Sequence, residues 1–209
     1  MSRLRVALAK GRLFEPSVAR FRQAGAAIND DGSRKLLIPS SDPAIEFLVV
    51  KPGDVPVYVE SGAADLGITG TDVLRESGAD VLEPLELQFG YCRLVVATPD
   101  GAPYPALPGG VTARVATKYP RLAQAWFAAA GRPVDIVQVG GSVEVAPLLN
   151  LSHWIVDLVD TGNTLRANGL VERETILQCG AVLVANRASQ KLKLDAYLDL
   201  MERLEQGTS

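Results

Sequence analysis

Apolar residues in this chain follow two spacings, and each spacing predicts one kind of secondary structure. Short runs dense in Val, Ile and Leu are typical of strands covered on both faces of a parallel sheet. Such runs cover residues 4–9, 45–50, 65–70, 91–98, 111–117, 134–139 and 154–159, and a further strand is expected over 34–39. Residues 171–186 are also rich in strand-forming side chains.

Between these runs, apolar side chains recur three or four positions apart, which predicts helices with one buried face. Phe14, Val18 and Phe21 define such a face in a helix that ends near Gly25. Further helices are expected over 51–62, 72–77, 120–130, 143–149 and 192–204, and another begins after the strand 154–159. Strands that alternate with helices predict an α/β protein built from βαβ units.

The order of these elements predicts two α/β lobes, each with its own sheet. The chain would pass into the second lobe at about Gly90 and return at about Gly180. Domain I then comprises residues 1–90 and 181–209, and domain II comprises residues 91–180. We expect a substrate-binding cleft between the lobes.

Composition limits the classes of partner. With 47% hydrophobic and 22% charged residues among 209, the chain has enough apolar material for a sizeable core. A net charge of -3 argues against a nucleic-acid surface, so local cations and backbone amides must hold any anionic substrate. No apolar run is long enough to span a bilayer or to form a signal peptide. We therefore expect a cytoplasmic protein without a nucleic-acid or membrane partner.

Residues that commonly carry metal or nucleophilic chemistry are scarce. Cys92 and Cys179 lack metal-site spacing, and we expect free thiols in the core. His153 is the single histidine, which leaves a zinc site or a serine triad poorly supplied, and its place before a strand favours a structural role. The Gly-rich motifs of nucleotide hydrolases and dinucleotide-binding proteins are absent, so both classes lose support.

The most informative chemistry follows the strand 154–159, which stops at small and hydroxyl-bearing residues. Turn amides and threonine hydroxyls there can form a cradle for a phosphate monoester. Asp157 and Asp160 lie at the carboxyl end of the strand, where they can face sugar hydroxyls or Mg²⁺. Alternatively, Asp160 or Thr161 only caps the next helix and Gly162 only forms the turn.

Cations and glycines mark the ends of two strands in the first lobe. Lys10 and Arg12 flank Gly11 after the first strand, where α/β sheets bind anions. Cations at a helix start oppose its dipole, which argues against two merely solvated charges. Gly67 and Gly70 indicate a close backbone approach, either of another element or of a ligand.

Taken together, these segments resemble the short form of ATP phosphoribosyltransferase, the first enzyme of histidine biosynthesis. The resemblance covers nearly the whole chain in the expected order, and the set of segments is highly specific. It is carried by residues 8–13, 33–36, 54–70, 114–120, 141–147 and 157–170.

The resemblance implies a two-lobed fold like that of type II periplasmic binding proteins, with substrates in the interlobe cleft. It also implies a glycosyltransferase reaction with Mg²⁺ as cofactor. In that reaction, N1 of the ATP adenine displaces pyrophosphate from C1 of phosphoribosyl pyrophosphate. Such a transfer has an oxocarbenium-like centre and depends on positioning and charge neutralisation, so it needs no protein nucleophile.

The resemblance further implies roles for single residues. The 5-phosphate loop corresponds to Thr161, Gly162, Asn163 and Thr164. The acids that face the ribose or Mg²⁺ correspond to Asp157, Asp160 and Glu144. The catalytic cations that meet pyrophosphate and the ATP phosphates correspond to Lys10, Arg12, Arg34 and Lys51. The glycines that line the cleft correspond to Gly11, Gly67 and Gly70.

The sequence departs from the family pattern at two positions. Lys51 stands where many relatives carry Arg, and the two side chains bind phosphate with different geometry. His153 stands where relatives often carry an acid, so the resemblance implies no role for it.

Length carries an implication about regulation. Long-form relatives have a C-terminal histidine-binding domain, whereas this chain ends after one more amphipathic helix. The resemblance therefore implies no intrinsic feedback by histidine and a separate regulatory subunit that resembles histidyl-tRNA synthetase. We expect a homodimer of this chain within a hetero-octamer.

Two other function classes remain as alternatives. A two-lobed solute-binding protein would share the fold, because fold does not fix function. Such a protein usually carries a secretory signal, and its ligands seldom need a hydroxyl-rich loop behind paired acids. A phosphoribosyltransferase for a nucleobase or orotate would use a similar loop on a different fold, which would not explain the segments 10–13 and 54–70.

Overall fold

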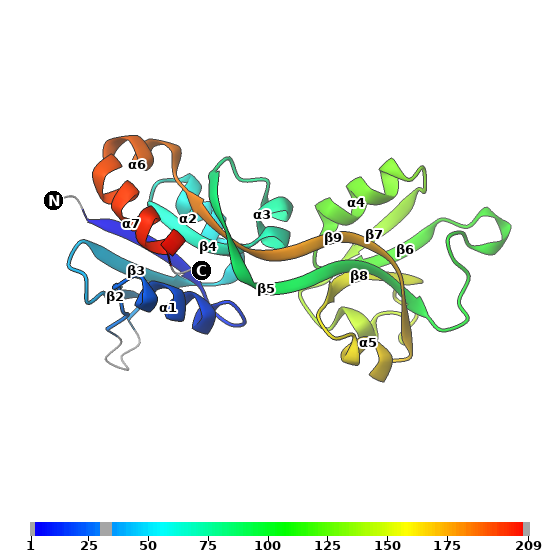
Figure 1. Cartoon of the computed structure of the whole chain (residues 1–209). Helices are drawn as coiled ribbons and strands as arrows, with labels where there is room; N and C mark the ends of the chain where they lie inside the picture. The colour runs from blue at the N-terminus through cyan, green and yellow to red at the C-terminus, as the bar shows by residue number, and fades with distance from the viewer. Residues whose placement is uncertain (1–2, 30–34, 207–209) are drawn as a thin grey trace. The chain divides into compact units, whose positions relative to one another are not determined.

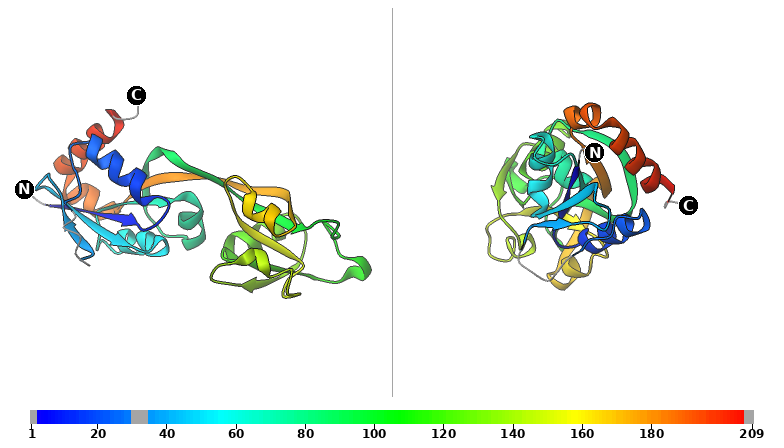
Figure 2. Two further views of the ribbon diagram at one scale, coloured as in Figure 1. Left: turned by 90° about the horizontal axis from the view of Figure 1, so that it is seen from below. Right: turned by 90° about the vertical axis from the view of Figure 1, so that its left-hand side faces the viewer.

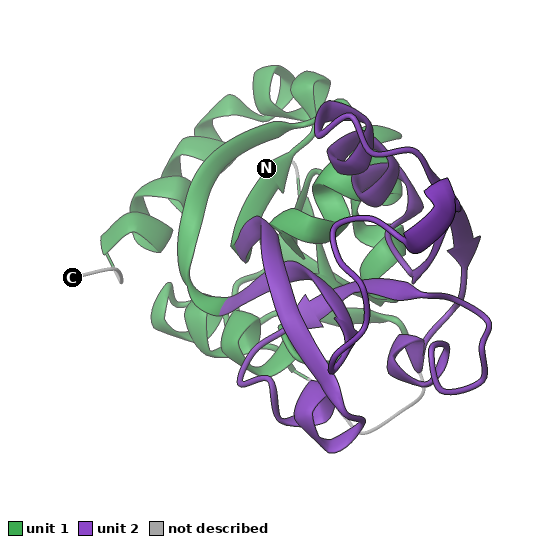
Figure 3. Cartoon of the chain, turned by 90° about the vertical axis from the view of Figure 1, so that its right-hand side faces the viewer, with its two compact units in different colours: residues 1–90, 180–209 green, residues 91–179 purple. Residues whose placement is uncertain are grey.

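The computed structural model describes residues 3–29 and 35–206, which form two compact units (Figures 1 and 3). Unit 1 comprises residues 1–90 and 180–209, and unit 2 comprises residues 91–179. The division expected from the sequence differs from this one only in the assignment of Gly180. The chain passes between the units within two long strands, β5 (Leu82–Pro99) and β9 (Leu170–Ala185).

Unit 1 is a sheet of mainly parallel strands with helices between them. Besides parts of β5 and β9, it contains β1 (Leu4–Ala9), α1 (Phe14–Gln23), β2 (Leu37–Pro39), β3 (Ile45–Val50), α2 (Val55–Glu60), β4 (Leu66–Gly70), α3 (Thr71–Ser77), α6 (Arg187–Leu192) and α7 (Leu194–Gln206). Its strands lie in the order β2-β3-β1-β4-β9. This order continues through β5 into unit 2 as one nine-stranded sheet, so the separate sheet expected for each lobe is wrong, because the long strands β5 and β9 belong to both units. β3 and β4 are parallel to β1, whereas β2 and the last residues of β9 are antiparallel to their neighbours.

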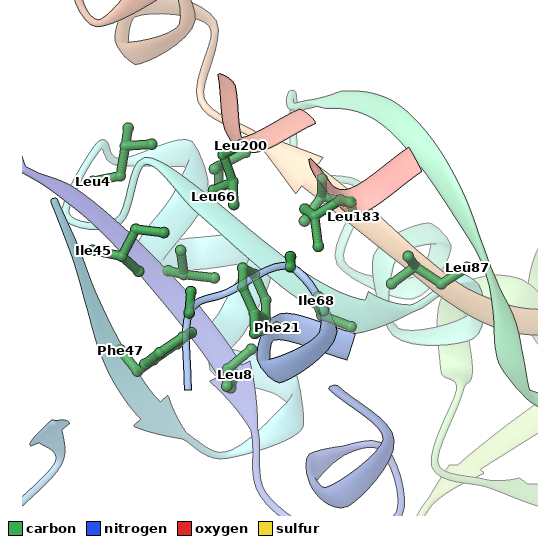
Figure 4. Close-up of a cluster of buried hydrophobic side chains, with 14 of the residues drawn as sticks. Leu4, Leu8, Phe21, Ile45, Phe47, Leu66, Ile68, Leu87, Leu183 and Leu200 are labelled. Carbon is green, nitrogen blue, oxygen red and sulfur yellow. The ribbon is translucent and has the colours of Figure 1, made fainter. Parts of the chain in front are cut away.

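Alternate residues of β1 pack on opposite faces of this sheet, as the two-residue period of a strand requires. Leu4 and Leu8 join a cluster with Phe21 and Phe47, whose rings meet edge to face with centroids 5.0 Å apart (Figure 4). Ala7 belongs to a second cluster, formed with side chains of α2 and α3. α1 and α7 lie side by side over the first face (Figures 1 and 2).

Unit 2 has the same plan with fewer helices. It contains parts of β5 and β9 together with β6 (Ala113–Thr117), α4 (Pro120–Ala129), β7 (Val134–Gln138), β8 (Trp154–Val159) and α5 (Asn163–Ala167). The strand order is β9-β5-β8-β6-β7; β8 and β7 are parallel to β6, and β5 is antiparallel to β8. α4 covers one face, and α5 with a 3-10 turn covers the other. The carboxyl ends of three parallel strands therefore meet at one edge.

Two expected helices differ from the observed ones. The helix expected over 143–149 is only the 3-10 turn Val143–Val145, since Pro147 has no N–H with which to continue a helix. The helix expected over 192–204 is the second of two, α6 and α7, which are separated by the non-helical Lys193.

Of the two long strands, β9 matches the segment expected to be strand-rich, whereas β5 was only partly expected. β5 begins at Leu82, whereas the sequence predicted a start at Tyr91. The first half of β5 was missed because exposed Glu83, Glu86 and Gln88 stand among its buried and partly buried apolar residues. Such a one-sided strand lacks the continuous apolar run that marks a strand buried on both faces.

No helix within the described part of the chain has the length and hydropathy needed to cross a membrane.

Candidate active site

The carboxyl edge of unit 2 holds the hydroxyl-bearing loop. β8 ends at Val159, and Asp160, Thr161 and Gly162 form a turn before α5 begins at Asn163. This is the order of strand, turn and helix that the sequence predicts. Gly162 is the N-cap residue of α5 and has φ 76°, a left-handed conformation that glycine adopts without steric cost. Gly162 itself offers no side chain to cap α5, but Thr161 Oγ1 accepts a long hydrogen bond from the Asn163 N–H at 3.5 Å, so Thr161 has part of the capping role considered above.

The loop exposes its polar side chains and carries a cation. Thr161, Asn163 and Thr164 are exposed. Arg166 folds back from α5, and its Nη2 donates to the Thr161 carbonyl oxygen at 3.1 Å and to Asn163 Oδ1 at 2.6 Å. A Cβ at Gly162 would lie 3.0 Å from Arg166 Nη1, so the glycine makes room for the guanidinium. Hydroxyls and a guanidinium in one loop are groups that bind phosphate.

Asp157 is a partly buried acid in β8, three residues before Asp160 at the start of this loop. Burial raises the pKa of its carboxyl group above the ordinary value. The Leu158 N–H, which donates to Asp157 Oδ1 at 2.9 Å, and the Lys118 ammonium lower that pKa, whereas the Glu144 carboxylate raises it. Glu144 and Lys118 therefore both lie close enough to Asp157 for their charges to act on its carboxyl group.

Neighbouring strands bring Glu144 and Lys118 to Asp157. Lys118 directly follows β6, and the 3-10 turn after β7 carries Glu144. Ser142 opens that turn with φ 48°, a conformation that is uncommon outside glycine. Lys118 was not among the residues expected at the site. Its position directly after a parallel strand is the sequence signal that could have indicated it.

The two acids suit a metal ion that is bound mainly by substrate. Within residues 3–29 and 35–206, no three His, Cys, Asp or Glu side chains are grouped to hold a metal ion. Mg²⁺ is commonly held by one or two carboxylates together with substrate phosphates and waters. Asp157 and Glu144 match that donor set, so the residues present fit Mg²⁺ delivered with a pyrophosphate group.

Unit 1 gathers cations at the carboxyl ends of its own parallel strands. Lys10 and Lys51 directly follow the neighbouring parallel strands β1 and β3, and both residues are exposed. The Lys10 N–H donates to the Val50 carbonyl oxygen at 2.8 Å, which continues the ladder to the edge. Because Ala9 pairs with Val50, Lys10 and Lys51 follow at neighbouring positions at the carboxyl end of the two strands.

Gly11 and Arg12 follow Lys10 in the turn into α1. Gly11 has φ 90°, a conformation that favours glycine, and Arg12 is exposed. Arg12 Nη1 donates to the Gly90 carbonyl oxygen at 2.8 Å. Arg34, the remaining cation expected at the site, lies outside the described residues.

Gly67 and Gly70 both lie in β4 and are buried. A Cβ at Gly67 would lie 2.8 Å from Val55 Cγ1 and 2.9 Å from Val59 Cγ2, so the close packing of α2 explains this glycine. A Cβ at Gly70 would lie 2.2 Å from Asp72 Oδ1, so this glycine makes room for a buried carboxylate. The approach of neighbouring protein groups thus accounts for both glycines without a ligand.

His153 and the cysteines belong to the frame of unit 2. His153 Nδ1 accepts a hydrogen bond from the Arg114 N–H at 2.9 Å, and the His153 N–H donates to the Arg114 carbonyl oxygen at 2.9 Å. These bonds confirm the structural role expected of His153. Cys92 and Cys179 are free thiols within the apolar cluster under α4.

Known proteins with the same fold fall into two groups. A solved ATP phosphoribosyl transferase (HisG:HisZ) complex from Thermotoga maritima contains a chain that matches this one with a TM-score of 0.86 and 33% identity, over 97% of each chain. The alkanesulfonate-binding protein SsuA from Xanthomonas axonopodis matches with a TM-score of 0.57 and 14% identity, over 99% of this chain and 73% of its own. The second match shows a shared fold alone, that of two-lobed periplasmic binding proteins.

Sequence relatives show to which of these two groups the chain belongs. The family model described as ATP phosphoribosyltransferase matches residues 51–206. ATP phosphoribosyltransferase from Sorangium cellulosum is 47% identical, with 99% of this chain and 96% of the relative covered. The enzyme of that name from Caldanaerobacter subterraneus is also 47% identical, with 96% and 95% covered. The chain therefore belongs to the ATP phosphoribosyltransferase family.

Proposed function

We propose that this chain transfers the 5-phosphoribosyl group of phosphoribosyl pyrophosphate to N1 of ATP, the first step of histidine biosynthesis. The bond between C1 and the pyrophosphate oxygen breaks, and pyrophosphate leaves with its electron pair. The N1 lone pair forms the new bond to C1, which gives N1-(5-phosphoribosyl)-ATP. The observation that carries this assignment is the hydroxyl-rich loop beside Asp157 and Glu144, in a chain of this family.

The loop residues Thr161, Gly162, Asn163 and Thr164 bind the 5-phosphate in this proposal. Exposed hydroxyls and the amides of the turn are the donors, and the Arg166 guanidinium supplies a positive charge beside them. A phosphate held here anchors the ribose without taking part in the reaction. That anchoring converts binding energy into orientation of C1.

Asp157 and Glu144 face the ribose in this proposal, with Asp160 at the start of the loop. Positive charge develops on the ribose as pyrophosphate leaves, so carboxylates on that side stabilise the transition state. Asp157 and Glu144 would hold Mg²⁺, which would supply positive charge to offset that of the pyrophosphate group. The Lys118 ammonium beside Asp157 lowers the pKa of that carboxyl group and so offsets part of the effect of burial, which raises it.

The exposed cations of unit 1, Lys10, Arg12 and Lys51, meet the phosphates of pyrophosphate and ATP in this proposal, and we assign Arg34 to the same set. Their charge favours departure of the pyrophosphate group. We keep Gly11 as a backbone contact of this region, because its turn leaves no side chain between the two cations.

We expect the chain to act with a regulatory subunit similar to histidyl-tRNA synthetase, as a homodimer within a hetero-octamer. The solved two-component Thermotoga maritima complex supports a second kind of subunit; the homodimer and the hetero-octamer rest on the family resemblance. ATP as a substrate favours a cytoplasmic location. A two-lobed solute-binding protein is the alternative, and its support is the fold shared with the sulfonate-binding proteins at 13 to 14% identity.

Formation of the product adduct tests this proposal. The protein is mixed with ATP, phosphoribosyl pyrophosphate, Mg²⁺ and a pyrophosphatase, and the absorbance of the adduct is followed with and without the regulatory subunit and histidine. We expect adduct formation, and inhibition by histidine only when the regulatory subunit is present. A folded protein that forms no adduct under either condition would point to the solute-binding alternative.

A further inference from the structure

Arg93 of β5 makes three hydrogen bonds that tie the 5-phosphate loop to the sheet. Its Nε and Nη2 donate to Glu172 Oε1 and Oε2 at 2.8 and 2.6 Å, and its Nη1 donates to the Asp160 carbonyl oxygen at 2.9 Å. Glu172 belongs to β9, and Asp160 opens the loop after β8. We propose that Arg93, oriented by Glu172, is a positioning residue that holds this loop ready for the phosphate of phosphoribosyl pyrophosphate.

The order of the strands explains how one side chain reaches both partners. β5 lies between β9 and β8, and Arg93 is the register partner of Val159, the last residue of β8. A guanidinium presents its N–H groups in a rigid planar fork. Two nitrogens therefore bind the Glu172 carboxylate side by side while a third is directed to Asp160.

The bond to Asp160 also orients a donor of the loop. A peptide unit is planar, so fixing the carbonyl group of Asp160 fixes the N–H of Thr161, which belongs to the same plane. That N–H is one of the groups assigned to the 5-phosphate. Loss of Arg93 would let this peptide plane rotate, and the loop would need to reorder each time a substrate binds.

Burial indicates that Arg93 and Glu172 serve the loop more than the fold. Their side chains are 31% and 30% exposed, so water screens the ion pair and limits its contribution to global stability. The hydrogen bond to Glu172 raises the pKa of Arg93, and the bond from Arg93 lowers the pKa of Glu172, so both groups stay ionised near neutral pH. The geometry is therefore retained over the pH range of an assay.

Unit 1 offers a matched control. Arg75 of α3 binds Glu83 of β5 through two nitrogens at 2.6 and 2.7 Å, and these side chains are 47% and 34% exposed. The pair copies the chemistry of Arg93 and Glu172, but both of its residues belong to the other unit. Arg75→Gln therefore removes an equivalent ion pair without touching the loop.

The inference rests on the proposed function, and two measurements test it in the full-length chain. The first is binding of phosphoribosyl pyrophosphate with Mg²⁺ by calorimetry; the second is hydrogen exchange of the segment 160–165. We expect Arg93→Gln to weaken binding about tenfold through lost positioning and to speed exchange of the segment. Arg93→Lys should behave similarly, because one ammonium cannot span both partners. Glu172→Gln should have a smaller effect, and Arg75→Gln should change neither measurement.

The outcomes separate this inference from the proposed function. Wild-type affinity and exchange in both Arg93→Gln and Arg93→Lys would overturn the positioning role, as would an equal loss in Arg75→Gln. Faster exchange of segment 160–165 in the Arg93 variants alone supports the role even if the wild-type chain forms no adduct. In active enzyme, the loss should appear as a raised KM for phosphoribosyl pyrophosphate with kcat retained, because a lost ground-state contact acts on binding.

Discussion

The carboxyl ends of the parallel strands differ in charge between the two units, although both units are built from parallel strands with covering helices. The edge of unit 1 presents the exposed cations Lys10, Arg12 and Lys51. The edge of unit 2 combines the acids Asp157 and Glu144 with an exposed hydroxyl-rich loop. The same position in the fold therefore carries different chemistry, because residues that directly follow a strand are free of the demands of the core.

This difference indicates a division of tasks between the units. Cations suit phosphates that must be neutralised as they leave, whereas acids suit a ribose carbon that becomes positive. Unit 2 also carries the cations Lys118 and Arg166 at this edge; Lys118 acts on the Asp157 carboxyl group, and Arg166 donates to the Thr161 carbonyl oxygen. Substitutions that change one edge and leave the other unchanged test whether the two edges have different tasks.

The largest effect is expected from the hydroxyl-rich loop. Thr161→Ala combined with Thr164→Ala should weaken binding of phosphoribosyl pyrophosphate by about 2 to 5 kcal/mol, because two hydroxyl contacts to a charged phosphate are lost. Calorimetry with Mg²⁺ measures this change. Thr112→Ala, an exposed threonine just before β6, serves as the control and should bind as the wild type does. Unchanged affinity in the double variant would remove the phosphate assignment from this loop.

A single cation of unit 1 should have a smaller effect. Lys10→Met should reduce kcat/KM by a factor equivalent to about 1.5 to 3 kcal/mol, the range for a hydrogen bond to a charged group. Steady-state adduct formation at low salt measures the loss. Lys191→Met on α6 removes an equal charge elsewhere in unit 1 and should leave the rate unchanged. Equal losses in the two variants would mean that net charge, and not the edge, governs substrate binding.

Gly67 tests whether the glycines of unit 1 serve packing or ligands. Gly67→Ala should destabilise the fold by about 1 to 3 kcal/mol, since the new Cβ overpacks against two stiff valines. Urea unfolding followed by circular dichroism measures this loss. A Cβ at Gly53 would meet nothing within 4 Å, so Gly53→Ala is the control for side-chain addition. Lost substrate affinity at wild-type stability would instead assign Gly67 to the ligand.

The smallest effect is a gain of stability at the acidic edge. Burial raises the pKa of Asp157 in the folded chain, so its ionised form is disfavoured there relative to the unfolded chain. The folded chain therefore loses stability as pH rises from the ordinary pKa of an aspartate through the raised pKa of Asp157. Asp157→Asn should therefore raise Tm at neutral pH while adduct formation falls, and the gain should vanish below about pH 4.

Calorimetric scans across this pH range measure the difference. Asp135→Asn, an exposed acid on β7, is the control for a change of net charge within unit 2. A lower Tm for Asp157→Asn at neutral pH would contradict the destabilising effect of the buried charge.

The elements that the sequence predicts best are those with both faces covered. β1, β3 and β8 each carry an apolar run with a single charged residue in it, and they begin and end at the expected residues. The polar residues directly after them could be assigned to shared edges, since parallel strands end on the same side. This reasoning singled out Asp157, and Glu144 was expected at the same site from the family resemblance alone.

Contacts that depend on register could not be predicted in this way. Arg93 looks like any cation in a strand until the order β9-β5-β8 places Glu172 and Asp160 on either side of it. Gly67 could equally have met a ligand until the packing of α2 was known. In both cases the deciding partner is distant in sequence, so local pattern holds no information about it.

The pairing of β4 with the last residues of β9 has a consequence for the growing chain. Leu66 pairs with Ala185 and Gly70 with Ala181, so the sheet of unit 1 is completed only after all of unit 2 has been synthesised. Until then, β4 presents an unpaired edge, which is a site of aggregation in nascent chains. Unit 2 is continuous in sequence and can fold as soon as it is made. The amino-terminal half of the protein is therefore the last part to close, in the reverse of the order of synthesis.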